Sequence, residues 1–185
     1  MNYVMPIRDK EKIKEMKQAL RKRSERDYMI FMIGINTGLR ISDILPLRVR
    51  DVKGAKMRVL EQKTNKIRSI SINDKLRVAF DKYIKGMKDN DYLIESRNVD
   101  ENGNKKPIHR NRAYEILKEA AEEVGLNAIG THSMRKTFGY HLYQQTKDIE
   151  AVRKILRHSS VNYTRVYIGI EDDYIDELYM KKTGL

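Results

Sequence analysis

The chain has 185 residues, of which 40% are hydrophobic and 35% are charged, a composition typical of a soluble globular protein rather than a disordered one. Lysine and arginine number 38 against 26 acidic residues, so the formal net charge is +12, which favours a polyanionic partner such as nucleic acid. The absence of cysteine excludes disulfides and thiolate metal sites. With no signal peptide or apolar membrane-spanning run, we expect one cytoplasmic domain over residues 1–185.

Helical periodicity dominates the first quarter of the chain. Apolar residues recur at helical spacing among lysines over residues 9–23, and Ser24 can begin a second helix. That second helix contains YMIFMIGIN, which is nearly all apolar and is therefore expected to be buried. Gly38 ends it, and a short helix beginning near Ser42 and disturbed by Pro46 is predicted to follow.

The pattern then changes from helix to strand. KMRVLEQ and IRSISI are typical of two β-strands, and KTNK between them suits a tight turn, which predicts a hairpin with Lys63 at its tip. Residues 74–88 return to a helical pattern, and DYLIES indicates a short strand. RNVDENGNKKP, residues 97–107, is the most loop-like segment and is expected to be a flexible loop.

Helices are predicted for most of the remaining chain. One covers residues 110–124 and is closed by Gly125, and another begins at Asp148 with DIEAVRKILRHSS. Between them lies THSMRKTFGYHLY, in which Met134, Phe138 and Leu142 mark a buried stripe. EDDYIDELYMKK, in the C-terminal tail 171–185, is long enough for one more helix. The expected fold is mainly α with a small antiparallel β-sheet (α+β).

Five separate places carry cations or proton-transfer groups. They are Arg40 after NTGL, Lys63 at the hairpin tip, His132 with Arg135, His158 in LRHSS, and Tyr167 in YTRVYIG. Each has an ordinary explanation when it is considered alone: a surface arginine, a turn lysine, a residue at a helix end, or a core aromatic. Their order along the chain therefore matters more than any one of them.

Together these motifs resemble those of the tyrosine recombinase (phage integrase) family, whose catalytic domain carries Arg, Lys, His-x-x-Arg, His or Trp, and Tyr. TGLRISDIL is similar to its first arginine box, QKTNKIR to its lysine hairpin, THSMRKTF to its His-x-x-Arg box, and LRHSS with YTRVYIG to its closing box. The separation of His158 from Tyr167 is also the family's habitual one. The resemblance covers residues 5–170 and implies the catalytic-domain fold of that family.

The charge that develops during phosphoryl transfer explains why these residue types are required. The non-bridging oxygens of a phosphodiester gain negative charge during attack, and planar guanidiniums bind such oxygens in fork geometry, which makes Arg40 and Arg135 the expected clamp. The resemblance implies that Tyr167 attacks phosphorus and forms a 3′-phosphotyrosyl link. It also implies His132 as the base, Lys63 as the acid that protonates the 5′ oxygen, and His158 as a hydrogen-bond donor to phosphate.

No cofactor or metal is expected for this reaction, because the phosphotyrosyl link retains the energy of the broken bond. The sequence agrees, since it has neither a Gly-rich phosphate loop nor a metal-type histidine motif such as H-E-x-x-H. Asp43 occupies a position where the family commonly has an acid, and its carboxylate can orient Arg40 or a neighbouring group.

Several residues compete with this assignment. Tyr163, Tyr174 and Tyr179 lie near Tyr167, and Lys66 shares the turn of Lys63, but none stands at the family position. The other two histidines are expected to have structural roles: His141 in packing or at the surface, and His109 at a helix start.

The resemblance makes double-stranded DNA the expected partner of an integrase from a phage or mobile element. It implies a homo-tetramer on paired sites, with a monomer in the absence of DNA, and leaves open whether the C-terminal tail docks in cis or in trans. Most relatives carry a separate N-terminal DNA-binding domain, and we expect none within residues 1–185, which leaves open whether this is a short stand-alone integrase or the catalytic part of a longer protein. We therefore expect weak, strongly salt-dependent binding of these residues to short duplexes.

Two alternative functions are considered. A type IB topoisomerase or telomere resolvase uses similar residues without joining two recombination sites. A non-catalytic helix-turn-helix DNA-binding protein would explain TGLRISDILPLRVRDV, which superficially has that pattern, but not the spacing of the other motifs.

Overall fold

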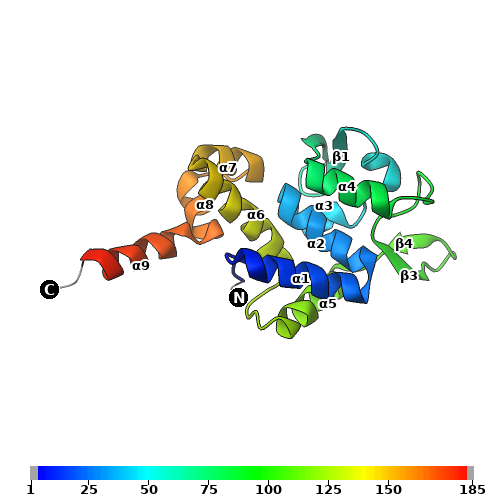
Figure 1. Ribbon diagram of the computed structural model, residues 1–185. Coiled ribbons are helices and arrows are strands. Elements are labelled where there is room, and N and C mark those ends of the chain that lie inside the picture. Colours follow the sequence, from blue (N-terminus) through cyan, green and yellow to red (C-terminus); the bar gives the residue numbers. More distant parts are fainter. Residues whose placement is uncertain (1–3, 183–185) are drawn as a thin grey trace.

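A computed structural model describes residues 4–182 (Figure 1). The helices are α1 (Lys10–Arg23), α2 (Glu25–Thr37), α3 (Ile41–Ile44), α4 (Asp74–Tyr83), α5 (Arg110–Glu123), α6 (Thr131–Thr146), α7 (Ile149–Leu156), α8 (Val161–Ile168) and α9 (Ile170–Lys182), with a 3-10 helix at Val49–Asp51. The strands are β1 (Lys56–Glu61), β2 (Lys66–Ser71), β3 (Glu95–Val99) and β4 (Lys105–Pro107). The chain is therefore mainly helical with small antiparallel sheets, as its sequence predicts.

Helix α2 forms the centre of the main hydrophobic core. It packs against α1, α4, α5 and α6, and the side chains of Met29, Ile30, Phe31 and Ile33 are at most 1% exposed. Ser24 caps its N-terminus by accepting hydrogen bonds from two backbone amides, and Gly38 ends it in the left-handed conformation at φ 65°. The prediction of a buried second helix bounded by these two residues is confirmed.

The β1–β2 hairpin lies where the sequence predicts it. Lys56 pairs with Ser71 at its open end and Glu61 with Lys66 at its closed end, which leaves residues 62–65 as the turn. Side chains of β1 alternate between exposed and buried, with Met57 and Val59 on the core side. The tip of the hairpin therefore projects past the core that anchors its base.

Two predictions about secondary structure are wrong, namely the loop at residues 97–107 and the C-terminal end of the helix at residues 74–88. Residues 97–107 are not a flexible loop, because β3 and β4 pair there, so the structure has a second two-stranded sheet. Asp100 explains this: its carboxylate accepts hydrogen bonds from the backbone amides of Asn102 and Asn104, and Gly103 supplies a positive φ, so polar residues close a turn. The segment DYLIES forms only an isolated bridge from Tyr92 to Arg48 before β3 begins.

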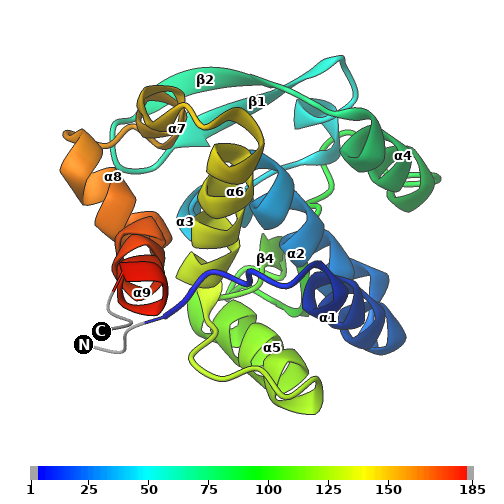
Figure 2. The same ribbon diagram turned by 60° about the vertical axis from the view of Figure 1, so that its left-hand side comes forward.

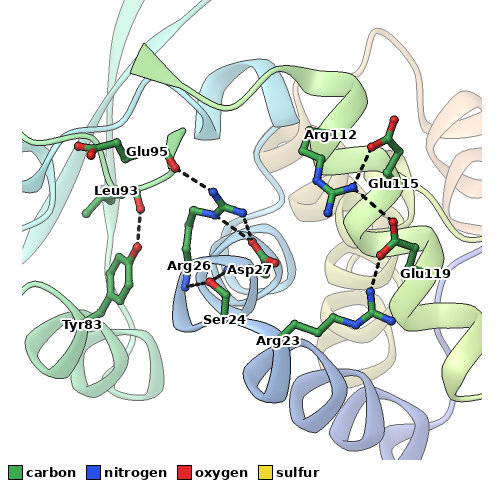
Figure 3. Close-up of polar contacts among 10 residues, drawn as sticks. All are labelled: Arg23, Ser24, Arg26, Asp27, Tyr83, Leu93, Glu95, Arg112, Glu115 and Glu119. Atoms are coloured by element: carbon green, nitrogen blue, oxygen red, sulfur yellow. Dashed lines mark hydrogen bonds and ion pairs between the residues drawn. The ribbon is translucent and has the colours of Figure 1, made fainter. Parts of the chain in front are cut away.

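The other error concerns the end of α4. The helix stops at Tyr83 rather than continuing to residue 88, and Ile84 is its C-cap. Gly86 has a φ of 85°, which an α-helix cannot contain, and the Tyr83 hydroxyl donates a hydrogen bond to the Leu93 carbonyl at 2.7 Å. The returning chain is thereby held against the helix end (Figure 3).

Ion pairs join α1 to α5, and a hydrogen bond joins α2 to β3 (Figure 3). Arg23, the last residue of α1, contacts Glu119 of α5 at 2.5 Å, and Arg112 contacts the same carboxylate at 3.3 Å. Arg26 pairs with Asp27 at 2.8 Å and donates to the Glu95 carbonyl at 3.0 Å. Arginines in this region therefore have acidic or carbonyl partners.

An extended N-terminal segment, residues 4–9, crosses α6. The backbone amide of Ile7 donates to Thr137 Oγ1 at 2.8 Å, and His141 Nε2 lies 2.9 Å from the Ile7 carbonyl. Arg8 then reaches the α8–α9 junction, where it donates to the Gly169 carbonyl at 2.9 Å and pairs with Asp173 at 2.7 Å. The segment therefore ties helices from the C-terminal third to the start of the chain.

Helix α9 extends away from the other helices (Figure 1). It confirms the helix expected after Tyr167, but residues 183–185 of the predicted tail lie outside the described residues. Side chains on α9 such as Tyr174, Tyr179 and Met180 are 60%, 67% and 86% exposed. None of the described helices has the length and apolar character needed to cross a membrane.

Candidate active site

A cavity of about 310 Å³ opens among the turn of the β1–β2 hairpin, the N-termini of α3 and α6, and the segment that joins α7 to α8. Its lining residues are Arg40, Lys63, His132, Arg135, Arg157, His158, Ser159, Tyr163 and Tyr167. All six residues that the sequence singles out therefore meet in one place, although they are spread over most of the chain.

Arg135 is held by the backbone on two sides. It is only 4% exposed, and its Nη1 and Nη2 atoms donate to the carbonyls of Gly38 and Leu156, respectively. A guanidinium has five N–H groups, so these two bonds fix its plane and leave other donors for a ligand in the cavity. The residue is thus both a possible phosphate ligand and a connection between the end of α2 and the end of α7.

Arg40 has a different environment. It is the N-cap residue of α3 and is partly buried, and its guanidinium makes no hydrogen bond or ion pair with any other residue in the described part of the chain. Its charge is therefore available to an anion, whereas Arg135 is already oriented. Together they supply two cations to one cavity, which is what a phosphodiester with developing negative charge requires.

The hairpin turn that carries Lys63 is anchored on both sides. The buried carboxylate of Asp43 accepts a hydrogen bond from the Gln62 amide at 2.9 Å, so this acid orients the hairpin rather than Arg40. Glu61, which is 3% exposed, accepts from Thr64 Oγ1 at 2.9 Å and pairs with Arg157. Within the described structure the Lys63 ammonium itself has no partner, and it is exposed at the cavity.

The hydrogen bonds around His158 assign its tautomer. Thr164 Oγ1 donates its only proton to the Ser160 carbonyl at 2.9 Å, so it must accept from His158 Nδ1, which lies 3.1 Å away. In the neutral ring Nε2 is then an acceptor. The expected hydrogen bond from His158 to phosphate therefore requires the ring to be protonated when the phosphate is bound.

Both histidines of the cavity are neutral at pH 7. Burial lowers the pKa of His158 to about 4, and the positive charges of Arg135 and Arg40 act in the same direction. Burial and the same two arginines also lower the pKa of His132. A neutral His132 can accept a proton, which is the state that a general base needs.

Tyr167 lines the same cavity as the arginines and histidines described above. Its ring centroid is 4.7 Å from that of His158, and Lys136 Nζ lies 5.3 Å from the centroid of its ring. Burial raises the pKa of Tyr167, while Arg135 opposes that rise by stabilising the phenolate. In the absence of a ligand the phenol is therefore protonated, and it needs a proton acceptor before it can act as a nucleophile.

The competing residues are placed less favourably. Tyr163 also lines the cavity, with its ring centroid 5.8 Å from that of Tyr167, but it is 53% exposed. Tyr174 and Tyr179 lie on α9, and Lys66 is the first residue of β2; none of the three lines the cavity. His141 contacts the N-terminal segment, and His109 is the N-cap of α5, so both have the structural positions that the sequence predicts.

Sequence reasoning missed several residues of the site. Arg157 and Ser159 line the cavity on either side of His158, and Glu61 buries its carboxylate against Arg157. LRHSS contained the signal for the first two, but a single charged residue in a strand, such as Glu61, gives none. Lys136, which the sequence analysis did not single out, is 8% exposed beside Tyr167.

The sequence of this chain is similar to those of known integrases and recombinases. The model of the phage integrase family matches residues 8–173. The probable integrase/recombinase YoeC of Bacillus subtilis is 49% identical over 186 aligned residues, which cover 100% of both chains. The tyrosine recombinase XerA of Pyrococcus furiosus is 28% identical over 171 residues, which cover 90% of this chain but only 58% of that protein.

Solved structures show the same fold. A crystal structure of XerA recombinase matches with a TM-score of 0.72 at 21% identity and covers 99% of this chain and 66% of that one. The catalytic domain of bacteriophage HP1 integrase matches with a TM-score of 0.63 at 20% identity, over 99% of this chain and 97% of that one. With a family match over most of its length and a relative that is 49% identical throughout, this chain belongs to the phage integrase family of tyrosine recombinases.

Proposed function

We propose that this chain is a site-specific recombinase that cuts and rejoins double-stranded DNA through a covalent bond to Tyr167. The observation that carries the proposal is the convergence of Arg40, Arg135, Lys63 and two histidines around that phenol in one cavity. The cavity holds cations, a proton acceptor and a nucleophile, which is the set that transfer of a phosphodiester requires.

The first chemical step exchanges one phosphate ester for another. The Tyr167 oxygen attacks phosphorus and gives its proton to His132, while the bond from phosphorus to the 5′ oxygen breaks. Lys63 donates a proton to that departing oxygen, which leaves a 3′-phosphotyrosyl bond and a free 5′-hydroxyl. Arg40 and Arg135 bind the non-bridging oxygens as their negative charge increases.

The second step reverses the first with a different strand. A 5′-hydroxyl from another DNA end attacks the phosphotyrosyl phosphorus and gives its proton to Lys63, while the phenol leaves with a proton returned by His132. The number of phosphoester bonds is unchanged, so no high-energy nucleotide is consumed. This reversibility is the chemical basis for joining two sites, and the protein would carry it out on DNA in the cytoplasm.

A trapping experiment tests the reaction on many candidate target sequences at once. The substrate is a pool of duplexes randomised around a nick, so that cleavage near the nick releases a short 5′-hydroxyl fragment that diffuses away and cannot be rejoined. We expect a protein–DNA adduct that survives denaturing electrophoresis, and sequencing the adduct's DNA identifies the preferred site.

Two matched tyrosine variants decide whether Tyr167 is the nucleophile. Tyr167→Phe should remove the adduct while retaining binding to the selected duplex, and Tyr163→Phe should still form it, since both tyrosines line the same cavity. Adduct formation by Tyr167→Phe, or its absence from the wild-type protein with every member of the pool, would refute the proposed function.

We propose a homo-tetramer on two paired DNA sites as the assembled form, in which α9 makes either cis or trans contacts. Its exposed side chains, including Tyr174 and Met180, support an intermolecular contact, whereas the Arg8–Asp173 pair favours packing on its own domain. Mixing Arg135→Ala with Tyr167→Phe protein tests for shared sites. Recovered cleavage requires one active site built from two chains, and no recovery places each site within one chain.

A further inference from the structure

A row of basic side chains on α1 lines a second hollow in the surface. Lys14, Lys17, Arg21 and Lys22 recur at helical spacing on one face of the helix and, with Gln18, border a cavity of about 490 Å³ whose remaining wall is Tyr28 of α2. We call this feature the α1 groove. None of its residues lines the catalytic cavity.

The groove and the catalytic nucleophile lie on different flanks of the protein. Figure 2 shows α1 and α4 on one side of α6, and α8 with α9 on the other. A polyanion bound in the α1 groove would therefore be a different segment from the one whose phosphate occupies the catalytic cavity. The basic surface in this part of α1 is not needed to explain strand cleavage.

Two of the four basic side chains of the α1 groove lack counterions in the described part of the chain. Lys17, which is partly buried, and Lys22 make no ion pair or hydrogen bond to other side chains in residues 4–182, and neither does Lys75 at the start of α4. Lys14 and Arg21 each contact one carboxylate at 3.3 Å. By contrast, Arg23 at the end of the same helix pairs with Glu123 and with Glu119, of which Figure 3 shows the second.

This clustering has an electrostatic consequence. Burial and the nearby charge of Lys75 lower the pKa of Lys17. The ammonium groups of Lys17 and Lys75 therefore repel each other in the folded protein. An anion in the groove would relieve that repulsion. Arg21 is already fixed in place, because its guanidinium carbon lies 3.8 Å from the centroid of the Tyr28 ring.

The length and composition of the basic row favour a nucleic-acid backbone over a lipid surface as its ligand. From Lys14 to Lys22 a helix rises by about 12 Å, a length over which one strand of a duplex presents about three or four phosphates. Helix α1 exposes no large hydrophobic side chain among the described residues, whereas a helix that binds a lipid surface needs an apolar face. The regular row of cations therefore fits a nucleic-acid backbone better than a membrane.

We propose that the α1 groove, together with Lys75, binds the phosphate backbone of a second segment of double-stranded DNA while the catalytic cavity holds the first. This inference rests on the proposed function for the identity of the polyanion. It adds a contact surface that acts without base recognition and brings two duplex segments to one protein molecule.

The test separates the two binding sites by filling the first one. Wild-type protein is trapped as its Tyr167 adduct on a short nicked duplex, and the purified adduct is titrated with a fluorescent duplex of unrelated sequence. We expect saturable binding of this second duplex. The variant Lys17→Glu/Lys22→Glu/Lys75→Glu should weaken it by at least about tenfold and reduce the slope of log affinity against log salt by about three.

A second triple variant controls for overall charge. Lys85→Glu/Lys88→Glu/Lys106→Glu changes the net charge equally at exposed lysines outside the groove and should leave binding of the second duplex within about twofold of wild type. The inference is overturned by an adduct that binds no second duplex, by equal losses in the two triple variants, or by a groove variant that loses only binding to anionic vesicles.

The outcome remains interpretable if the proposed function fails. Without an adduct, free protein is titrated with the same duplex and the number of bound duplexes per chain is measured. A groove-dependent loss of affinity, absent from the control variant, supports the surface although the chemistry is wrong, and no groove-dependent loss overturns it.

Discussion

The candidate active site lies between two hydrophobic clusters of very different size. Arg40, His132 and Arg135 stand beside the main core, in which α2 is almost completely enclosed. His158 and Tyr167 belong to the C-terminal helices, whose own cluster has only Val152, Leu156 and Ile168 fully buried. Because local stability follows buried apolar contacts, the proposed nucleophile, Tyr167, stands on the weaker of the two regions. We therefore expect Arg40 and Arg135, the proposed phosphate ligands, to stay fixed in position and Tyr167 to be able to shift.

The two arginines provide the largest test of this comparison. Arg135→Ala removes a phosphate ligand and also the donors that join Gly38 of the main core to Leu156 of the C-terminal cluster. Single-turnover cleavage should fall about a thousandfold, and the free energy of unfolding should fall by about 2–3 kcal/mol, because two buried carbonyls lose their donors. The measurements are adduct formation and urea denaturation.

Arg40→Ala is the matched control for that variant. It removes the other cation from the same cavity, but its guanidinium has no partner within the described chain. Cleavage should again fall by a factor of about 10²–10³, whereas stability should change by less than about 0.5 kcal/mol. Equal losses of stability in the two variants would show that Arg135 does not connect the two regions.

Substitution of Lys63, in the turn of the β1–β2 hairpin, should have the next largest effect on the cleavage rate. Lys63→Ala should slow cleavage about a hundredfold, because the departing 5′ oxygen loses its proton donor. A substrate in which sulfur replaces that oxygen should restore most of the rate, since a thiolate leaves without protonation. Lys66→Ala, in β2, should cleave both substrates at nearly the wild-type rate. A sulfur substrate that fails to rescue Lys63→Ala would assign this lysine to phosphate binding instead.

A substitution at Gly139 tests how tightly α6 packs against the C-terminal cluster of Val152, Leu156 and Ile168. An added Cβ would stand 2.7 Å from Ile168 Cγ2 and 3.0 Å from Leu156 Cδ1, so Gly139→Ala should force α7 and α8 away from α6. We expect about tenfold slower cleavage and faster amide hydrogen exchange in α7 and α8, with little change in α2. The overpacking cost of about 1–3 kcal/mol exceeds the gain in helix propensity of about 1 kcal/mol.

Gly34→Ala is the control, because it introduces a similar steric clash in the main core instead of the C-terminal cluster. Its added Cβ would lie 2.6 Å from Met134 Sδ, at the contact of α2 with α6 in the main core. It should lower global stability and accelerate exchange in α2 as well as in the C-terminal helices. If Gly139→Ala gave that same pattern, the two clusters would unfold as one unit, and the distinction between them would be lost.

The sequence predicted these two regions unequally. Helix periodicity and caps such as Ser24 and Gly38 are local signals, so the buried α2 and the β1–β2 hairpin could be located from them. The β3–β4 pair was missed because the turn made by Asp100 carries polar residues that are equally common in loops. Convergence of the six candidate residues followed only from family resemblance, since spacing cannot specify which distant segments meet.

Long-range polar contacts were beyond any local pattern. Neither the attachment of Asp43 to the hairpin turn nor that of Arg8 to the α8–α9 junction can be read from neighbouring residues, because each partner lies far along the chain. The tautomer of His158 depends likewise on Thr164, whose hydroxyl has a role only once α8 has formed. Sequence thus indicated which groups are candidates for the chemistry, and packing decided how each is oriented.

Acid sensitivity is an expected effect on stability alone, and it again concerns the C-terminal region. His158 has a pKa of about 4 in the folded protein and of about 6.5 when unfolded, so the unfolded chain takes up this proton first as pH falls. The folded state is therefore unaffected by His158 above pH 6.5 and loses up to about 3 kcal/mol between pH 6.5 and pH 4.

Urea denaturation between pH 7 and pH 4 measures this loss, with His158→Gln as the variant that cannot titrate. Its stability should depend less on pH than that of the wild type. His132 contributes in the same direction, because its pKa is also lowered, so part of the loss should remain in His158→Gln. A wild-type curve that is flat over this range would mean that His158 is solvated and that the C-terminal cluster does not enclose it. The nucleophile beside it would then need DNA to complete its surroundings.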